Sequence, residues 1–559
     1  MCSVSLIWSF FLAVLAWLPL QLVRFLRRRQ LRLGGVVRIK LEATARPGSS
    51  SERARQIERI REMADDEHVK VVFFRLEGIP VGWASMQDLR EAIITLNAAG
   101  KKTAAHLDQA GNGELYLASA AERVWMPPPG DLFLSGLGGR LSFFGNILAR
   151  LGVQVDMVAA GAYKSFGEPF TRSFASPANR EQMGVLYGDL QDQMVSAIAL
   201  GRGKEPAEIS ALLARSPLSV TEAVELGLID AAAYADQVEE RLEKLAASER
   251  VRVTSWRGYG RLRGMERWLV GLGQRGRSVA VVHLEGSVVL GGEGSRTRRI
   301  EARAVVPVLD ALAEDESIKA VVLRVDSGGG SAVASDLIAR AVERLGRTRP
   351  VIALYGNISA SGGYYLSVPA REIIARPGSI TGSIGVIGGK VVVADTLGRQ
   401  GLTSDFIDVG PDVGFLGPWR PFTPDQRARF EGYLDRTYDV FLKVVAGGRR
   451  CPVEAIRPYA GGRVWTGRQA KENGLIDHLG GLPTAINRAK MLSDIQPGRG
   501  RVVHIDFAPS PIRALASRLS RGQLVGTVLG LAGKQGELVE MLREEPGRAL
   551  AMMPWVLEK

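Results

Sequence analysis

Two glycine-rich turns in the second half of the chain contain the residues best placed for covalent chemistry. Residues 326–331 read DSGGGS and residues 359–363 read SASGG, and each turn follows an apolar run. Glycine permits a positive φ and lets backbone N–H groups approach a ligand closely. A serine on a turn from a strand to a helix presents its hydroxyl at the edge of a sheet. Ser361 is therefore the first residue to consider as a reactive group.

The spacing of the two turns favours a common site. About 30 residues separate them, and their pattern predicts a strand, a helix and a second strand. In a parallel sheet such a unit brings both turns to one carboxyl edge, where open α/β sheets bind their ligands. The alternative is that serine and glycine stand in these turns for conformational reasons alone.

The chain contains an internal duplication. Residues 71–78 match residues 320–327 at an offset of 249, and residues 222–230 match residues 469–477 at an offset of 247. In both copies strand-like runs alternate with helical ones, which predicts βαβ units around a largely parallel sheet. The predicted fold class is α/β, with two tandem domains of one fold.

The length of 559 residues is too great for a single core, and we predict five segments. They are an N-terminal anchor with an arginine-rich flank (1–34), a first repeat (35–245), a linker (246–277), a second repeat (278–495) and a C-terminal tail (496–559).

The N-terminal segment predicts a membrane anchor. Residues 4–23 carry no charge, and a run of this length is enough to span a bilayer. A basic cluster follows, made of Arg24, Arg27, Arg28, Arg29 and Arg32. A transmembrane helix, an interfacial helix and a cleaved signal peptide are the alternatives, although no basic residue precedes the apolar run. The arginines favour a cytoplasmic body, because basic flanks tend to stay on that side.

The composition favours an ordinary globular protein at a membrane. The net charge is +13 with 46% hydrophobic residues, and we assign the basic balance to lipid ahead of nucleic acid. The two cysteines, Cys2 and Cys451, exclude a disulfide framework. The five histidines are scattered without metal-ligand spacing, so we predict neither a metal nor another cofactor.

The two repeats differ where chemistry would occur. At the offset of 249 the first repeat has Asn112 in place of Ser361, and it lacks the full glycine cluster. Conversely, the first repeat contains Lys164 within residues 160–170, whereas the corresponding region of the second repeat, residues 408–415, has no lysine. One copy therefore keeps a serine and the other a lysine.

Several motifs together resemble the signal peptide peptidase A family, in its long tandem-domain type. They are the turn at 326–331, residues 360–364 (ASGGY), 381–385 (TGSIG), 163–169 (YKSFGEP) and 464–467 (VWTG), and the resemblance covers nearly all of residues 36–492. It implies a membrane-bound serine protease of the Clp and crotonase-like fold that degrades signal peptides with a Ser-Lys dyad. It also implies peptide substrates, a homotetramer and no cofactor.

The resemblance assigns roles to individual residues. Ser361 corresponds to the nucleophile, Lys164 to the general base and Ser383 to the hydroxyl that orients the amine. The N–H groups of Gly362 and of Gly329 or Gly330 would form the oxyanion hole. A lysine can accept the proton of a serine only when it is neutral, which requires a desolvated position.

Departures from the family pattern leave alternatives open. Residues 326–328 are Asp-Ser-Gly where the family usually has Asn-Ser-Pro, so Asp326 would add a charge near the oxyanion hole. The family usually places its protease domain outside the cytoplasm, contrary to the order of the arginines. A crotonase-like acyl-CoA enzyme and a catalytically weakened scaffold of the same fold are the competing functions.

Overall fold

The computed structural model describes residues 2–42, 50–79, 82–271, 277–291, 298–410, 412–496, 499–507 and 550–552. The chain forms two compact units. Unit 1 comprises Met1–Gly138 and Gly188–Arg277, and unit 2 comprises Gly139–Tyr187 and Ser278–Lys559. The segment 139–187 belongs to the first repeat in sequence, yet it packs as part of unit 2.

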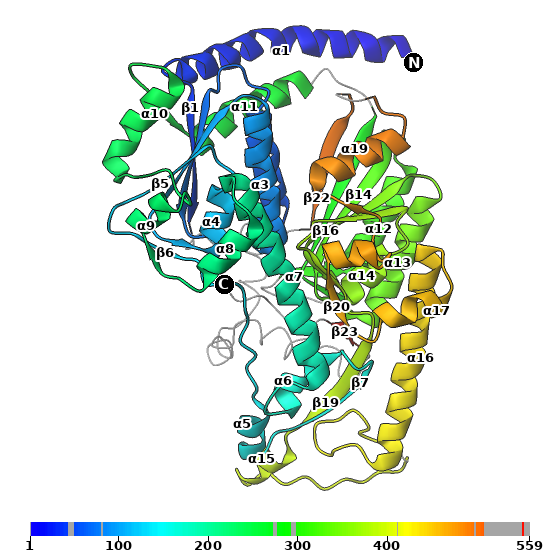
Figure 1. Ribbon diagram of the computed structural model, residues 1–559. Helices are drawn as coiled ribbons and strands as arrows, with labels where there is room; N and C mark the ends of the chain where they lie inside the picture. Colours follow the sequence, from blue (N-terminus) through cyan, green and yellow to red (C-terminus); the bar gives the residue numbers. More distant parts are fainter. Residues whose placement is uncertain are drawn as a thin grey trace. The chain divides into compact units, whose positions relative to one another are not determined.

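Unit 1 is built on a parallel sheet with the strand order β10-β1-β2-β3-β5-β9 (Figure 1). Its strands are β1 (Val36–Glu42), β2 (Val71–Glu77), β3 (Lys102–Leu107), β5 (Arg123–Met126), β9 (Ala231–Ala232) and β10 (Val253–Ser255). Residues 71–74 of β2 are all buried, as expected where helices cover both faces of a parallel sheet. A small sheet joins β4 (Ala110–Gly111), β6 (Asp131–Phe133) and β8 (Leu218–Ser219).

The helices of unit 1 follow the alternating pattern that the sequence predicts. They are α1 (Cys2–Leu31), α2 (Ser50–Glu62), α3 (Trp83–Ala98), α4 (Asn112–Ala118), α8 (Pro206–Leu213), α9 (Val220–Glu225), α10 (Val238–Ala246) and α11 (Trp256–Gly271). The long helix α7 (Pro177–Arg202) begins in unit 2 and ends in unit 1.

The main sheet of unit 2 has the strand order β20-β18-β16-β14-β11-β22, and β17 pairs with both β16 and β21. Its strands are β11 (Ser278–Glu285), β14 (Ile318–Ser327), β16 (Val351–Ala360), β17 (Glu372–Ala375), β18 (Ile380–Gly382), β20 (Val464–Thr466), β21 (His478–Leu479) and β22 (Arg501–Asp506). All of these pairings are parallel except that of β18 with β20. The core of the unit packs around β11, β14 and β16.

A second sheet of unit 2 contains a strand from the first repeat. Its order is β13-β12-β15-β23-β19-β7, with β7 (Gln154–Ala160), β12 (Ser287–Val289), β13 (Arg299–Glu301), β15 (Gly329–Ser331), β19 (Val386–Val392) and β23 (Leu550–Met552). β7 pairs antiparallel with β19 along its whole length, from Ala160 opposite Val386 to Gln154 opposite Val392. This pairing holds residues 154–160 within unit 2.

The helices of unit 2 follow its strands along the chain. They are α5 (Gly145–Arg150), α6 (Glu168–Thr171), α12 (Ala302–Glu314), α13 (Ala332–Gly346), α14 (Gly362–Ser367), α15 (Ala394–Gly398), α16 (Pro424–Arg449), α17 (Val453–Ile456), α18 (Gly467–Glu472) and α19 (Leu482–Leu492). Single turns of 3-10 helix lie at Ser165–Gly167, Ala235–Gln237 and Arg457–Tyr459.

The two units share one strand topology. The path β10-β1-β2-β3-β5-β9 in unit 1 corresponds, in chain order and direction, to β22-β11-β14-β16-β17-β21 in unit 2. The outer strands β10 and β22 lie beyond the ends that the sequence predicts for the repeats, at 245 and 495. Both are edge strands, and they extend each copy into the segments predicted as the linker and the tail.

The predicted anchor corresponds to α1, which contacts α11 in the linker segment. The side chains of residues 2–16, which carry much of the apolar run, lie outside the described residues. Within the part of the chain that is described, no helix combines the length and the apolar character needed to cross a membrane.

Two arginines after the apolar run form ion pairs inside unit 1. Arg27 Nη1 lies 3.2 Å from Asp66 Oδ2 and 3.0 Å from Glu266 Oε2, and Arg24 Nε lies 3.1 Å from Glu266 Oε1. The Tyr259 hydroxyl also donates to Asp66 Oδ2 at 3.0 Å. Arg27 is only 8% exposed, so its charge serves the fold. The sequence had suggested a role at a lipid surface, which is wrong for this arginine.

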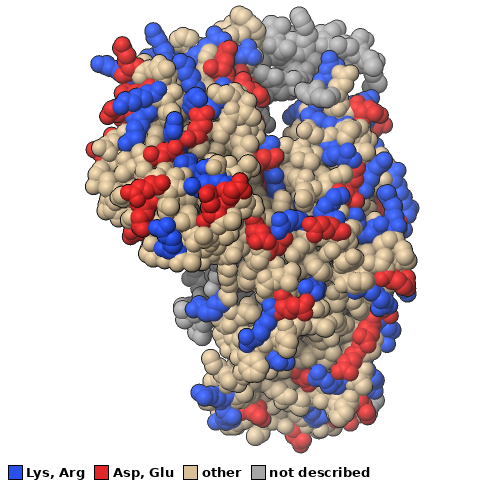
Figure 2. All heavy atoms as spheres, in the orientation of Figure 1, with Lys and Arg blue, Asp and Glu red and all other residues tan. Residues whose placement is uncertain are grey.

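The visible surface mixes charges of both signs. On the face drawn in Figure 2, acidic and basic side chains are interspersed among uncharged ones. A nucleic-acid-binding face usually carries a continuous basic stripe instead. The excess positive charge is therefore not gathered into such a stripe on this face.

We expect the Arg27→Met substitution to lower the free energy of unfolding of the full chain by about 3 kcal/mol, because it removes the cation that pairs with the buried Asp66 carboxylate. The exposed Arg28 on the same helix provides a matched control. Arg28→Met should change stability by less than about 0.5 kcal/mol. Urea denaturation followed by circular dichroism measures both values, and equal effects of the two substitutions would contradict the buried ion pair.

Candidate active site

Ser361 occupies a strained turn between β16 and α14. Its φ of 54° and ψ of −118° are unfavourable for a residue with a Cβ, and such a conformation costs about 1–3 kcal/mol. Its N–H donates to the carbonyl of Gly382 at 2.8 Å, and its own carbonyl accepts from the N–H of Tyr365 at 2.8 Å. These bonds hold the backbone in place, so the direction of the Cα–Cβ bond of Ser361 is fixed.

The two glycine-rich turns lie against each other, as their spacing predicts. A Cβ on Gly362 would come within 3.1 Å of the nitrogen of Gly330, and a Cβ on Gly363 within 2.8 Å of the carbonyl oxygen of Ser327. Side chains at these positions would push the turns apart. Glycine is therefore required here by a close approach of two backbones.

Lys164 follows β7 and reaches the Ser361 hydroxyl. Its Nζ lies 2.7 Å from Ser361 Oγ, 3.0 Å from Ser383 Oγ and 3.1 Å from the carbonyl oxygen of Ser383. The exposed fractions are 3% for Lys164 and 0% for both serines. All three residues belong to unit 2, because the pairing of β7 with β19 brings the lysine of the first repeat into it.

Burial controls the charge of the amine. Desolvation lowers the pKa of Lys164 well below its usual value of 10.5. Its hydrogen-bond partners are two hydroxyls and a carbonyl, which a neutral amine can satisfy. The amine is therefore suited to accept a proton, and Ser361 carries the nearest hydroxyl proton.

The backbone at Lys164 is supported by residues that the sequence gave no reason to select. The N–H of Tyr163 donates to the carbonyl of Gly461 at 2.9 Å, and a Cβ on Gly462 would lie 2.5 Å from the nitrogen of Lys164. The buried amide of Gln182 donates to the carbonyl of Tyr163 at 3.1 Å and accepts from the N–H of Val464 at 3.3 Å. A lone glutamine within a long helix carries no signal that would identify this role.

The predicted oxyanion glycines lie together beside Ser361. Gly329 and Gly330 have φ values of 103° and 158° in β15, and Gly362 is the first residue of α14. The N–H of Gly329 donates to Ser327 Oγ at 3.1 Å. That bond occupies one of the predicted donors in this conformation.

The carboxylate of Asp326 is bound by the neighbouring strand. Its Oδ1 accepts from the N–H of Ile358 at 3.1 Å, and its Oδ2 accepts from the amide of Asn357 at 3.4 Å. A Cβ on Gly356 would lie 2.7 Å from Asp326 Cγ, so the side chain packs closely on β16. The sequence predicted that Asp326 would add a charge near the oxyanion hole. In the structure its carboxylate connects β14 with β16.

The first repeat has a structural amide at the equivalent turn. Asn112 Nδ2 donates to the carbonyl of Gly136 at 2.7 Å, and its Oδ1 accepts from the N–H of Gly136 at 3.2 Å. Both bonds lie within unit 1. An amide that satisfies two backbone groups closes this turn, and it offers no nucleophile.

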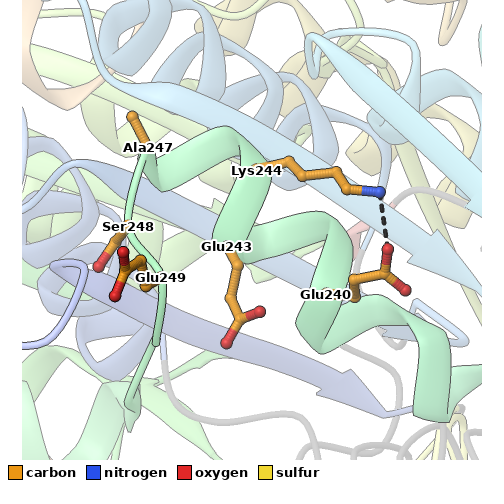
Figure 3. Close-up of a pocket in the computed structure, with 6 residues that line it drawn as sticks. All are labelled: Glu240, Glu243, Lys244, Ala247, Ser248 and Glu249. Carbon is orange, nitrogen blue, oxygen red and sulfur yellow. Dashed lines mark hydrogen bonds and ion pairs between the residues drawn. The ribbon is translucent and has the colours of Figure 1, made fainter.

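Other features of the described residues provide no comparable chemistry. A depression of about 420 Å³ on unit 1 lies along α10, and Figure 3 shows that it is lined by Glu240, Glu243, Lys244, Ala247, Ser248 and Glu249. Lys244 is paired there with Glu240 at 2.7 Å on the exposed surface. Among the described residues, no cluster of three or more His, Cys, Asp or Glu side chains could hold a metal ion.

The lowered pKa of Lys164 predicts a pH dependence of stability. Because the folded state binds this proton less tightly than the unfolded state, raising the pH toward 10.5 favours the folded chain. Between pH 8 and pH 10, wild type should gain up to about 1.4 kcal/mol per pH unit relative to Lys164→Met. Urea melts at several pH values measure this difference.

The exposed Lys443 is the matched control for this measurement. Lys443→Met should follow the wild-type pH dependence, because this side chain is exposed to water and is not desolvated on folding. A difference between wild type and Lys164→Met that does not change with pH would contradict a buried neutral amine.

Comparison with known proteins gives the family. The chain matches Peptidase family S49 over residues 95–249 and 343–496. It is 30% identical over 435 residues to serine protease SPPA, chloroplastic, of Arabidopsis thaliana, covering 77% of this chain and only 64% of that protein. It is 28% identical over 488 residues to Protease 4 of Salmonella typhi, covering 82% of this chain and 75% of that protein. A solved structure of a ClpP1 mutant from Listeria monocytogenes matches with a TM-score of 0.25 and 13% identity, over 37% of this chain and 94% of that one. Because the family match falls in both repeats and covers more than half of the residues, the chain belongs to peptidase family S49.

Proposed function

We propose that this chain is an endopeptidase in which Ser361 is the nucleophile and Lys164 is its general base. The observation that carries the proposal is the 2.7 Å contact between Lys164 Nζ and Ser361 Oγ in a buried site. Membership of peptidase family S49 and similarity to named serine proteases support the reaction class. The lowered pKa of Lys164 supports the choice of base.

The first step is acylation of Ser361. The neutral Lys164 amine takes the hydroxyl proton while Ser361 Oγ attacks the carbonyl carbon of the peptide bond. The oxyanion that forms would accept hydrogen bonds from the N–H groups of Gly362 and of Gly329 or Gly330. The Lys164 ammonium then gives its proton to the leaving amine. In deacylation the Lys164 amine takes a proton from water while the water oxygen attacks the acyl carbonyl carbon, and the proton passes to Ser361 Oγ as the ester bond breaks.

Ser383 acts in this proposal as the residue that orients the base. Its hydroxyl and its carbonyl oxygen both contact Lys164 Nζ, so they restrict the rotation of the amine. They also accept hydrogen bonds from the transient ammonium, which would otherwise be buried without partners. Ser383 also has a positive φ of 50°, which is unfavourable for a residue with a Cβ.

The cellular setting is proposed from the sequence. The uncharged residues 4–23 support attachment to a membrane through the N-terminal segment, and a membrane enzyme would meet short apolar peptides such as cleaved signal peptides. A Clp and crotonase-like fold for each repeat and a homotetrameric assembly belong to the same proposal. The proposal does not assign the catalytic body to either side of the membrane.

Loss of either member of the dyad should abolish hydrolysis. We expect Ser361→Ala and Lys164→Ala each to lower kcat/KM for a chromogenic peptide ester by about 10³-fold or more. The purified full-length chain is assayed beside the two variants, with circular dichroism to confirm folding. Equal rates in all three proteins would reject the dyad.

The pH profile provides a separate test of the base. Since only the neutral amine can accept a proton, kcat/KM should rise with pH through the lowered pKa of Lys164 and level off above it, below pH 10.5. Lys164→Arg should be inactive at every pH, because a guanidinium does not lose its proton in proteins. A wild-type rate that is constant from pH 5 to pH 10 would argue against Lys164 as the base.

A further inference from the structure

One loop supports both of the segments that place the base amine. Residues 460–463 lead directly into β20, and the last of them is Arg463. The carbonyl of Arg463 accepts from the N–H of Ser383 at 2.7 Å. Earlier in the same loop, the carbonyl of Gly461 accepts from the N–H of Tyr163 at 2.9 Å. A movement of this loop would therefore move both the base and the residue that orients it.

The side chain of Arg463 lies between two aromatic rings. Its guanidinium carbon is 4.9 Å from the ring centroid of Tyr163 and 4.7 Å from that of Trp465. Trp465 follows two positions later in β20, a spacing that puts two side chains on one face of an extended segment. The Trp465 Nε1 donates to the carbonyl of Tyr459 at 2.9 Å, which holds the indole in place. The guanidinium thus joins the loop to the residue directly before Lys164.

A carboxylate pairs with this stacked guanidinium. Glu181 Oε1 lies 3.0 Å from Arg463 Nη1, and Glu181 Oε2 accepts from the Tyr163 hydroxyl at 3.0 Å. Only 18% of the Arg463 side chain is exposed, and a cation–π contact strengthens as the cation leaves water. A guanidinium suits this place better than an ammonium, because its faces stack on rings while its edge pairs with a carboxylate. We call Tyr163, Glu181, Arg463 and Trp465 the arginine clamp.

The clamp matters because the Lys164 amine depends on the exclusion of water. The contacts of its Nζ are two hydroxyls and a carbonyl oxygen, and desolvation is the cause of its lowered pKa. If the backbone at residue 163 could move, water would reach the amine and return it toward its charged form. Ionisable side chains that contact this segment or the loop are Tyr163, Glu181, Tyr438 and Arg463.

We propose that Arg463 is a positioning residue of the site, whose side chain holds the Lys164 segment so that the amine stays buried and within reach of Ser361. Arg463 acts through Tyr163 and Ser383 and not on the substrate. The kinetic test of this inference rests on the proposed function, whereas its stability test does not depend on catalysis.

The kinetic test uses Arg463→Gln, which removes the charge and the guanidinium plane. We expect kcat per active site for a peptide ester to fall about tenfold or more, with KM changed by less than about twofold. The inflection of the pH profile of kcat/KM should move upward by at least about half a pH unit, because a hydrated amine holds its proton more tightly. Burst titration with a serine-directed phosphonate counts the active sites, so that loss of folded enzyme does not lower the measured kcat.

Two further variants control this result. Arg420 stacks on Phe406 at 3.7 Å and pairs with Asp408 at 2.6 Å, so Arg420→Gln removes the same two kinds of contact elsewhere in unit 2. It should keep the wild-type kcat and pH profile. Arg463→Lys keeps a charge for Glu181 but loses the planar stack, and it should lie between wild type and Arg463→Gln. It takes the place of Arg463→Gln in every measurement if that variant does not fold.

A stability measurement tests the inference without catalysis. As the pH rises, the wild-type chain begins to gain stability over Lys164→Met at the pKa of the folded amine, because only above it does the unfolded state bind one more proton. When both proteins also carry Arg463→Gln, this onset should move upward by at least about half a pH unit. Urea melts of the four proteins between about pH 5 and pH 10 measure both onsets.

The outcomes separate this inference from the proposed function. An onset that moves upward supports the clamp, and a wild-type chain without hydrolysis would at the same time reject the dyad. An onset that stays at the wild-type pH overturns the inference whether or not kcat falls, because Arg463 would then not keep water from the amine. Loss of hydrolysis in Ser361→Ala and Lys164→Ala would still support the dyad in that case.

Discussion

The burial of the Lys164 amine is the constraint on which the rest of unit 2 depends. A charged amine in an apolar interior costs several kcal/mol, so burial favours the neutral form of the amine as long as water is excluded. Water is excluded only if the amine is enclosed and the surrounding backbone cannot move away from it. The contacts of Gly461 and Gly462 with residues 163–164 meet that requirement, since backbone packs directly on backbone.

The duplication explains how a lysine from the first repeat reaches the serine of the second. Both repeats keep the same six-strand order, so the copied sheet itself supplies no path between the two residues. The path comes from β7, which leaves the first repeat and pairs with β19 of the second. Residues 139–187 thereby become part of unit 2. A strand placed in this way lets one site contain residues from both repeats.

The sequence was sufficient for some of these features and insufficient for others. Apolar runs ending in glycine predicted β14, β16 and their meeting turns, because periodicity and glycine content are local properties. The match of residues 222–230 with 469–477 reflects a repeated ion pair, Arg202 with Asp230 and Arg449 with Asp477. Packing between distant segments left no comparable pattern in the sequence. Three features depend on contacts between residues far apart in sequence. They are the placement of β7 in unit 2, the support from Gln182 and the pairing of β23.

The divergence of the two turns follows from hydrogen-bond satisfaction. In unit 1 the Asn112 amide bonds both the N–H and the carbonyl of Gly136, so one side chain satisfies two backbone groups of the turn. In unit 2 the serine hydroxyl is satisfied by an amine that arrives from another segment. The two corresponding turns thus carry an amide that bonds the backbone in one unit and a hydroxyl that contacts an amine in the other. β7 brings Lys164 into unit 2, whereas in unit 1 the corresponding turn is closed by the bonds of Asn112 to Gly136.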